Sequence, residues 1–493
     1  MNETHHHDTL AKTIIKYSSS TIYRRVLGIF TAFLRPKLLS LELYGLWSLI
    51  NIIPNYITFL PFGSRTAMRY EIPFNESAGA TDRNEIIKGS VFRGTLVISI
   101  IASLALIAFS FKPGLGTEVR WGLITMALVV LLFWYYEYFI TVLKSYQNFS
   151  LITRSHYLGT TVLCVSTIVL LFFFSIYGLY LSLLLTHVVV IYYLRSRHRL
   201  NLTPGFDLSV FLSLIKKGFP ITLFSITTML IRTSDKLVIG YFLGIKELGY
   251  YGIAIMVFSF LIDIPGASRE VLEPKLLQSF GSGEKEKGLY EYFLKPLVSS
   301  AYLLPFIIGP AVIMLPVVIP LILPRYIPGI VPAEIIVIGS YFLSISYIIR
   351  GTIVASGLQL SAAKINIFTL AINVIINIIL IKAGYGLIGV AIGSSLSFLF
   401  LLVCLLLLVK KKCGGIDHNW APTISAILWP FPVMCVILVL LSLFASGTTL
   451  NEYMLAVVKL VTFTILMFIF LAIAKGRFEL IKGLELKKLW NKK

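Results

Sequence analysis

Residues 230–244 read LIRTSDKLVIGYFLG, and this segment places charged residues inside an apolar run that extends from 215 to 241. A bilayer is crossed by about 20 mostly apolar residues, so the run is long enough to be a transmembrane helix. Asp235 and Lys236 follow Arg232 by three and four positions, which puts all three on one helix face. Charges at that depth cost about 2.5–3.5 kcal/mol or more each unless they face protein or water. The segment predicts a polar cavity; the alternative is a pair that neutralises itself near the outer interface.

The whole chain has the composition of a polytopic membrane protein. Of its 493 residues, 57% are hydrophobic and 13% are charged, whereas soluble domains have about 25% charged residues. The net charge of +20 favours contact with anionic lipid and not with nucleic acid, because the basic residues follow the pattern of membrane topology. The four cysteines have no CxxC spacing, so neither a disulfide framework nor a metal site is expected.

About fourteen apolar segments are long enough to cross a bilayer. They lie at 16–38, 44–66, 89–110, 120–143, 155–175, 176–194, 215–241, 247–269, 296–323, 332–354, 361–381, 386–409, 422–444 and 452–474. Roughly three quarters of the 43 Lys and Arg residues lie in the termini and the even-numbered loops, which the positive-inside rule assigns to the cytosol. Both termini are then cytosolic. The basic C-terminal tail either rests on anionic headgroups or is simply solvated.

The chain repeats itself at an interval of 204 residues. The motif PFGSR at 61–65 falls on PGASR at 265–269, and Gly45 falls on Gly249 in the same register. About six helices separate the copies, and an even number restores the orientation, so two lobes related by an axis along the membrane normal are expected. The predicted organisation is an N-lobe at 1–200, a cytosolic linker at 201–214, a C-lobe at 215–412, two further helices at 413–475 and a basic cytosolic tail at 476–493.

Other charged positions belong to the same cavity or to its entrance. Arg24 and Arg25 lie about 12 Å along the first helix and either face Arg232 across the cavity or snorkel to the headgroups. Arg65 and Arg269 occupy the repeated motif, next to Pro61 and Pro265, which are expected to bend or end their helices. With Asp263 the two arginines form a candidate inner gate; the alternative is plain positive-inside anchoring.

The predicted cavity has more cations than anions. Its basic members are Arg24, Arg25, Arg232 and Lys236, and its acid is Asp235. That excess suits an anionic substrate, and Arg in particular suits phosphate through paired hydrogen bonds. Asp235 either holds the cations in place or exchanges a proton or Na⁺.

Several polar residues elsewhere are expected to have ordinary roles. Arg35 is expected to be a loop charge at the outer mouth. His156 and His187 either titrate near neutral pH or, as the usual role, pack between helices. Asn373 and Asn377 lie four apart and are expected to hydrogen-bond helices together, a substrate role being the alternative.

No enzyme motif accompanies these residues. The chain has no GxxxxGK[ST] phosphate loop, no GxSxG and no zinc motif, so a secondary carrier without a cofactor is expected. A polytopic glycan polymerase or ligase would have a long outer loop rich in Arg and His, and the outer loops here are short. A drug exporter for cations would need a cavity richer in acid than in base, and a membrane scaffold would have a neutral cleft.

Three motifs together resemble the polysaccharide biosynthesis, or oligosaccharide flippase, family. They are residues 235–251, the LYGLW at 43–47, and the GYGLIGVA at 384–391 with two asparagines before it. The resemblance implies the fold of the multidrug/oligosaccharidyl-lipid/polysaccharide exporters: two six-helix lobes in a V, here with two added C-terminal helices.

The resemblance also implies a function. Members of O-antigen type move polyprenyl-pyrophosphate-linked oligosaccharides across the plasma membrane by alternating access, using cavity Arg, Lys and Asp. The positions here that match that role are Arg24, Arg25, Arg232, Asp235 and Lys236. The sequence shows no full match to the lipid II flippase pattern, so a peptidoglycan precursor is an alternative substrate, as is a small molecule moved by an ion-coupled exporter of the same fold.

Overall fold

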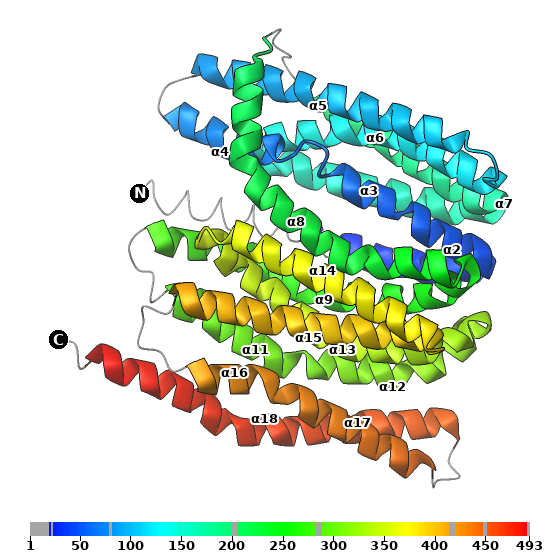
Figure 1. Cartoon of the computed structure of the whole chain (residues 1–493), viewed down its shortest axis with the longest axis vertical. Coiled ribbons are helices and arrows are strands. Elements are labelled where there is room, and N and C mark those ends of the chain that lie inside the picture. The colour runs from blue at the N-terminus through cyan, green and yellow to red at the C-terminus, as the bar shows by residue number, and fades with distance from the viewer. Residues whose placement is uncertain are drawn as a thin grey trace. The chain divides into compact units, whose positions relative to one another are not determined.

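The computed structural model describes residues 19–20, 23–77, 81–146, 148–198, 205–281, 288–413, 420–446 and 451–490. Within these ranges every regular element is a helix (Figure 1), and eleven helices are long and apolar enough to cross a membrane. The prediction of an all-α integral membrane protein is therefore confirmed. The total of about fourteen spans and the internal repeat remain predictions.

The chain divides into two compact units, Met1–Met229 and Leu230–Lys493. Unit 1 contains a helix at 23–38 and then, in chain order, α2 (Leu41–Ile50), α3 (Ile52–Ile57), α4 (Ser64–Ser77), α5 (Thr81–Ser110), α6 (Thr117–Ser145), α7 (Phe149–Arg197) and the first part of α8 (Leu208–Phe242). The boundary between the units falls inside α8, and the predicted lobe limits remain a prediction.

α8 begins before the predicted apolar span does, inside the segment predicted as a linker. Its first turn is capped by Asp207, whose Oδ1 accepts hydrogen bonds from the backbone N–H of Ser209 at 2.8 Å and of Val210 at 3.2 Å. The Ser209 hydroxyl donates to the same oxygen, and together these bonds lower the pKa of the Asp207 carboxyl. An Asp at the N-cap satisfies backbone donors that the first turn leaves unpaired, so the helix starts there.

The second predicted span, 44–66, is not one continuous helix. α2 and α3 adjoin at Asn51, and the chain then turns through 58–63, where Phe62 has φ 47° and Gly63 has φ 92°. Pro61 lies within this turn, so the expected proline break is present, whereas α9 (Ile245–Gly281) continues through Pro265. Gly63 also touches the backbone of Gly218 in α8, and a Cβ on either glycine would collide with the backbone of the other. Only two glycines permit so close an approach.

α7 covers two predicted spans, 155–175 and 176–194, because its chain reverses at Ser175. Ser175 has φ 51° and ψ −132°, and the Thr167 hydroxyl donates to the Ser182 hydroxyl at 3.4 Å across the two arms. Gly178 lies against the backbone of Leu170, where no side chain fits. The result is a tight helical hairpin whose turn is flanked by the exposed apolar residues Phe172, Phe173, Phe174 and Tyr177.

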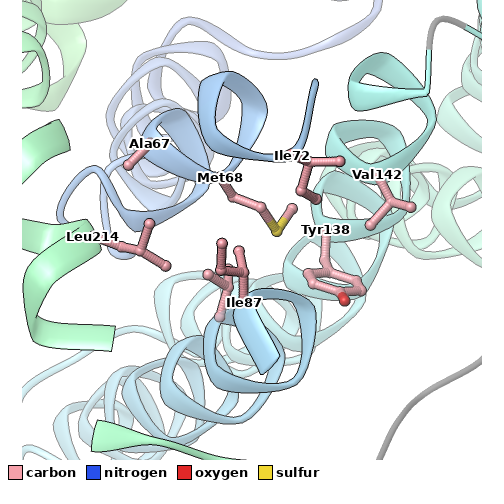
Figure 2. Packing of buried hydrophobic residues seen from close by; sticks show 8 residues of the cluster. Ala67, Met68, Ile72, Ile87, Tyr138, Val142 and Leu214 are labelled. Carbon is pink, nitrogen blue, oxygen red and sulfur yellow. The ribbon is translucent and has the colours of Figure 1, made fainter. Parts of the chain in front are cut away.

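A buried apolar cluster joins four helices of unit 1 (Figure 2). Met68 at its centre is fully buried, and α4, α5, α6 and α8 supply the other members, Ala67, Ile72, Ile87, Val91, Tyr138, Val142 and Leu214. α6 is further tied to α5 by Trp134, whose indole N–H donates to the Thr95 hydroxyl at 2.8 Å. This cluster fixes α4 and α8 on the pair α5–α6, so it positions the two glycines that meet between them.

Met68→Ala should destabilise unit 1 by about 2 kcal/mol. The substitution leaves a cavity where a fully buried side chain contacts three neighbouring helices, and lipid cannot fill it. The measurement is the thermal unfolding midpoint of the purified protein in detergent. Val97→Ala, which truncates an exposed side chain of the neighbouring helix α5, is the matched control; equal midpoints for the two variants would contradict the assigned packing.

Unit 2 is built around α13 (Ile330–Ala355), the most buried of its long helices. α13 packs against α9 and α15 (Gly386–Cys413), and α14 (Gln359–Lys382) packs against α15 (Figure 1). The remaining elements are the single π turn η1 (Tyr290–Leu294), α11 (Lys295–Leu303), α12 (Pro305–Ile322), η2 (Pro324–Gly329), α16 (Trp420–Leu428), α17 (Pro430–Ser446) and α18 (Glu452–Trp490). α12 contacts both α17 and α18, which attaches the two C-terminal spans to this unit.

Candidate functional site

The carboxylate of Asp235 lies in the interior of unit 2, on the C-terminal part of α8, and its residue is 6% exposed. Oδ1 accepts hydrogen bonds from the hydroxyl of Ser394 at 2.6 Å and from the amide nitrogen of Asn377 at 3.4 Å. Oδ2 accepts one from the hydroxyl of Tyr251 at 3.1 Å. Four helices, α8, α9, α14 and α15, therefore converge on one carboxylate.

A second set of hydrogen bonds surrounds this carboxylate. The Ser234 hydroxyl donates to Oδ1 of Asn373 at 2.9 Å, and Nδ2 of Asn373 donates to the Ser394 hydroxyl at 3.0 Å. Asn377 also donates to Oδ1 of Asn373, at 3.3 Å. All these side chains are buried. We call the group formed by Ser234, Asp235, Tyr251, Asn373, Asn377 and Ser394 the Asp235 cluster.

The Asp235 cluster contains a negative charge that forms no salt bridge among the described residues. In the described part of the chain the salt bridges are Lys88 with Glu85 and Lys217 with Glu71, and none reaches Asp235. Its hydrogen-bond partners are all neutral hydroxyl and amide groups. A buried carboxylate without a salt bridge is costly in an apolar interior, so it is stabilised by taking up a proton or a cation.

The cluster also offers oxygen atoms beyond the carboxylate. Oδ1 of Asn377 is buried and has no hydrogen-bond partner among the described residues. It lies against Gly393, where a Cβ would collide with it, so a side chain at that position would displace the amide. Carboxylate, amide and hydroxyl oxygens are the ligands that hard cations prefer. The arrangement is thus suited chemically to a proton or to an alkali cation.

Arg232 and Lys236 lie on the same helix as Asp235 but form no described salt bridge with it. Arg232 is half-buried; its guanidinium lies 5.7 Å from the ring centre of Tyr347 and donates to the hydroxyl of that tyrosine at 3.2 Å. Lys236 is half-buried as well, and it is close enough to both Asp235 and Arg232 to interact with them electrostatically. The direct contacts of the carboxylate are therefore with neutral groups, although the spacing along the helix had placed the three charges on one face.

The other predicted cavity residues, Arg24 and Arg25, belong to unit 1, on the helix at 23–38. Arg24 is exposed and lines a pocket of that unit, and Arg25 is half-buried. A single cavity that contains all five residues remains a prediction.

Arg65, a predicted gate residue, is buried at the start of α4. Its Nη2 donates to the backbone carbonyl of Thr58 at 3.0 Å, so Arg65 closes the turn between α3 and α4. The side chains of Asp263 and Arg269 lie outside the described ones, although both residues are in α9. The inner gate remains a prediction.

Comparison with known proteins identifies the family. A family model described as polysaccharide biosynthesis protein matches residues 37–326, which is more than half of the chain. The chain belongs to the polysaccharide biosynthesis protein family. No curated protein sequence matches it.

Solved transporter structures share the fold of this family member. The lipid II flippase MurJ in an inward-closed conformation has a TM-score of 0.69 at 17% identity, and the match covers 95% of this chain and 100% of that one. An inward-facing multidrug resistance transporter of the MATE family in the MOP superfamily has a TM-score of 0.64 at 14% identity, and the match covers 82% of this chain and 96% of that one. A MOP superfamily transporter from Pyrococcus furiosus has a TM-score of 0.55 at 13% identity, covering 83% and 97%. The fold is that of membrane transporters of this superfamily, and the expected resemblance is confirmed.

Sequence analysis missed three members of the Asp235 cluster, Ser234, Tyr251 and Ser394. Each had a visible signal, and Ser234 directly precedes Asp235. Tyr251 ends the LGYY of the motif that begins at Asp235, and Ser394 follows three residues after the end of the GYGLIGVA motif. Asn373 and Asn377 had been assigned to helix packing, and they do join α14 to α8 and α15, but they do so at the carboxylate itself.

Proposed function

We propose that this protein moves a polyprenyl-pyrophosphate-linked oligosaccharide from the cytosolic to the outer leaflet of the plasma membrane, with both termini in the cytosol. Membership of the polysaccharide biosynthesis family supports a glycan substrate. The basic residues Arg24, Arg25, Arg232 and Lys236 support an anionic headgroup, because guanidinium groups pair well with phosphate oxygens. Alternating access brings the headgroup across, and the lipid tail stays in the bilayer.

The observation that carries the mechanism is the buried carboxylate of Asp235, whose hydrogen bonds all come from neutral groups. Uptake of a proton or Na⁺ makes the Asp235 cluster neutral, and release restores the charge. Because the cluster joins α8 to α9, α14 and α15, the two charge states favour different packings of these helices. A gradient of that cation then drives the conformational cycle. Any ligand with different affinities for two states shifts the balance between them in this way.

The membrane potential assists the same movement. Transfer of two negative charges outward at 100 mV releases roughly 4–5 kcal/mol, at about 2.3 kcal/mol per charge. A coupling cation carried inward adds to that free energy, and one carried outward with the substrate reduces it.

The test is transport in proteoliposomes with one gradient at a time. The purified full-length protein is reconstituted with a lipid-linked oligosaccharide, and the appearance of its sugar at the outer leaflet is measured with a lectin. A Na⁺ gradient at constant pH, or a pH gradient without Na⁺, should accelerate movement. If neither gradient nor an imposed potential changes the rate, the coupled mechanism is wrong.

A second substrate is favoured by a specific observation. The solved structure of the lipid II flippase MurJ is similar in fold over 95% of this chain and over the whole of its own length. Lipid II shares the polyprenyl-pyrophosphate, so the same cations suit it. Depletion of this protein in its native cell separates the two: accumulation of a non-peptidoglycan glycan lipid supports the main proposal, and accumulation of lipid II supports the second.

Arg232→Ala should lower the transport rate by about 10-fold or more. The side chain is held by Tyr347 and is half-buried, so its removal deletes a fixed cation that we assign to the anionic headgroup. Arg232→Lys keeps the positive charge but not the planar guanidinium group, so its transport rate should fall less than that of Arg232→Ala. Lys246→Ala removes an exposed charge from the start of α9 and is the matched control. Equal transport by the control and by Arg232→Ala at equal expression would remove Arg232 from the substrate site.

A further inference from the structure

Unit 1 contains a partly open pocket of about 350 Å³. Its wall is formed by the helix at 23–38, by α6 and by both arms of the α7 hairpin. The pocket runs from Arg24 to Arg35, about 16 Å along the first of these helices. Its volume lies within the range of pockets that hold small polar molecules, and it is much larger than a single ion requires.

The charges that line this pocket are all positive or neutral. Arg24 and Arg35 line it together with His156 and His187, and no acidic residue is among the described residues of the wall. Glu137, next to Tyr136 on α6, is close enough to His187 to interact with it electrostatically, but it does not line the pocket. A cationic pocket within a helical bundle favours the binding of an anion, because a charge without a counter-charge is unfavourable there.

Arg35 is the best-placed group for binding such an anion. Its guanidinium lies 5.7 Å from the ring centre of the buried Trp47, which holds the planar fork in place. Its Nε is buried and has no hydrogen-bond partner among the described residues. A fixed guanidinium with an unused N–H matches the spacing of two oxygens in a carboxylate or phosphate. The expectation that Arg35 is an ordinary loop charge is therefore wrong.

The hydroxyl groups of the wall are arranged as acceptors. Thr31 donates to the backbone carbonyl of Gly28 at 3.1 Å, Thr160 to that of His156 at 2.7 Å, and Thr186 to that of Ser182 at 2.7 Å. Each hydroxyl has thereby used its one hydrogen on its own helix and keeps oxygen lone pairs. These lone pairs can receive hydrogen bonds from a polyol such as a sugar ring.

The imidazole of His187 is also held in one orientation. Its Nδ1 is 2.8 Å from the carbonyl oxygen of Leu183, and because a carbonyl only accepts, Nδ1 carries the hydrogen. The rings of Phe133 and Tyr136 pack edge-on against it, with centres 5.9 and 6.2 Å away. Nε2 is then the ring atom available to a ligand: it accepts from a sugar hydroxyl when neutral and donates to an anion when protonated.

We propose that this pocket binds a sugar that carries a carboxylate or phosphate group, with the anionic group on Arg35 and the ring hydroxyls on the threonines. We call it the unit 1 sugar-anion site. It lies in unit 1, apart from the Asp235 cluster in unit 2, and the argument for it does not depend on the proposed transport function. The sugar comes either from the transported glycan or from a free sugar acid or sugar phosphate.

The test is ligand binding to the full-length protein in nanodiscs of neutral lipid. Glucuronate and glucose 1-phosphate are the probes, glucose is the neutral control, and the thermal unfolding midpoint is measured. At least one anionic probe should raise the midpoint by about 2 °C or more, and glucose should not. Arg35→Gln should weaken the response about 10-fold or more in probe concentration. Lys37→Gln, an exposed charge on the same helix, should respond as wild type does.

Three results would overturn the proposal: no response to either sugar anion, an equal response to glucose, or an unchanged response in Arg35→Gln. Undecaprenyl phosphate is used as a further probe. If it alone raises the midpoint, the site binds the lipid carrier and not a sugar anion, and this result would overturn the proposal as well. Arg35→Lys guards against misfolding, since it keeps the charge and should retain part of the response. A parallel export assay identifies the source of the sugar: slower export of an acidic glycan by Arg35→Gln indicates the transported glycan, and unchanged export indicates a free sugar anion. Binding is measured without any gradient, so failure here leaves the transport proposal standing.

Discussion

Asp235→Asn should abolish the dependence of transport on a proton or Na⁺ gradient and lower the rate about 10-fold or more. Asparagine has nearly the shape of the neutral carboxyl group, so the cluster can pack, but it can no longer alternate between two charge states. The hydroxyls of Ser394 and Tyr251 donate to different oxygens of Asp235. In Asp235→Asn one of them would keep an oxygen acceptor, and the other would face the amide nitrogen. We expect normal expression and folding together with slow, gradient-independent transport in proteoliposomes.

Two serines of α15 provide a matched control for this prediction. Ser394 donates to Asp235 at 2.6 Å, whereas the buried Ser397 donates to the carbonyl of Gly393 at 2.8 Å within its own helix. Ser394→Ala should impair transport and shift its dependence on the cation, and Ser397→Ala should do neither. If Asp235→Asn retains gradient-driven transport at the wild-type rate, the coupling role of Asp235 is wrong, whatever the substrate is.

Gly218→Val should prevent unit 1 from folding normally. The backbones of Gly218 in α8 and Gly63 in the turn before α4 are in direct contact, and a Cβ at position 218 would overlap the carbonyl group of Gly63. A backbone cannot rotate away as a side chain can, so α8 must separate from α4. Overpacking of this kind costs about 1–3 kcal/mol or more, a large part of a total stability of about 5–15 kcal/mol. The expected result is a strong fall in monodisperse protein on size exclusion and a lower unfolding midpoint.

Gly205→Ala is the control for this substitution, because a Cβ there would have nothing within contact distance. It should leave both the elution profile and the midpoint unchanged. Gly63→Ala should repeat the defect of Gly218→Val, since Gly63 combines the same contact with a φ of 92° that side chains rarely adopt. A Gly218→Val protein with the wild-type midpoint would show that α4 and α8 are not packed as described.

The helical spans were largely predictable because a membrane restricts both their length and their composition. The α7 hairpin illustrates this: no Gly or Pro stands at Ser175 or next to it, yet an apolar run of that length exceeds one bilayer thickness and had to turn near its middle. The early start of α8 was missed because its cap, Asp207, precedes the apolar run by several residues. The break in the predicted span 44–66 could be expected from the turn-forming sequence PFG at 61–63. The contact between Gly63 and Gly218 could not be expected from the sequence.

The candidate site was predictable in its central residue and not in its partners. Asp235 could be identified from the sequence because a charge within an apolar transmembrane helix has a high free-energy cost. Its partners Asn373 and Ser394 lie on two other helices, and the rotation of each helix about its own axis decides which side chain meets the carboxylate. Sequence spacing had grouped Asp235 with Arg232 and Lys236; Lys236 does interact with the carboxylate electrostatically, but the hydrogen bonds of that carboxylate come from neutral side chains on other helices. Arg35 was misjudged for the same reason, since Trp47 and the α7 hairpin bury its Nε.

The tip of the α7 hairpin limits where unit 1 can be reached from water. Its turn consists of a single residue flanked by phenylalanines whose exposed fractions are 72%, 71% and 55%. Exposed aromatic surface of this size is stable in contact with acyl chains and interfacial headgroups, so the two arms end within the membrane. Soluble proteases, biotinylating reagents and antibodies against inserted epitopes should therefore not reach the tip of this hairpin. The thickness of the host bilayer, and not the length of a loop, sets how far its two helices extend.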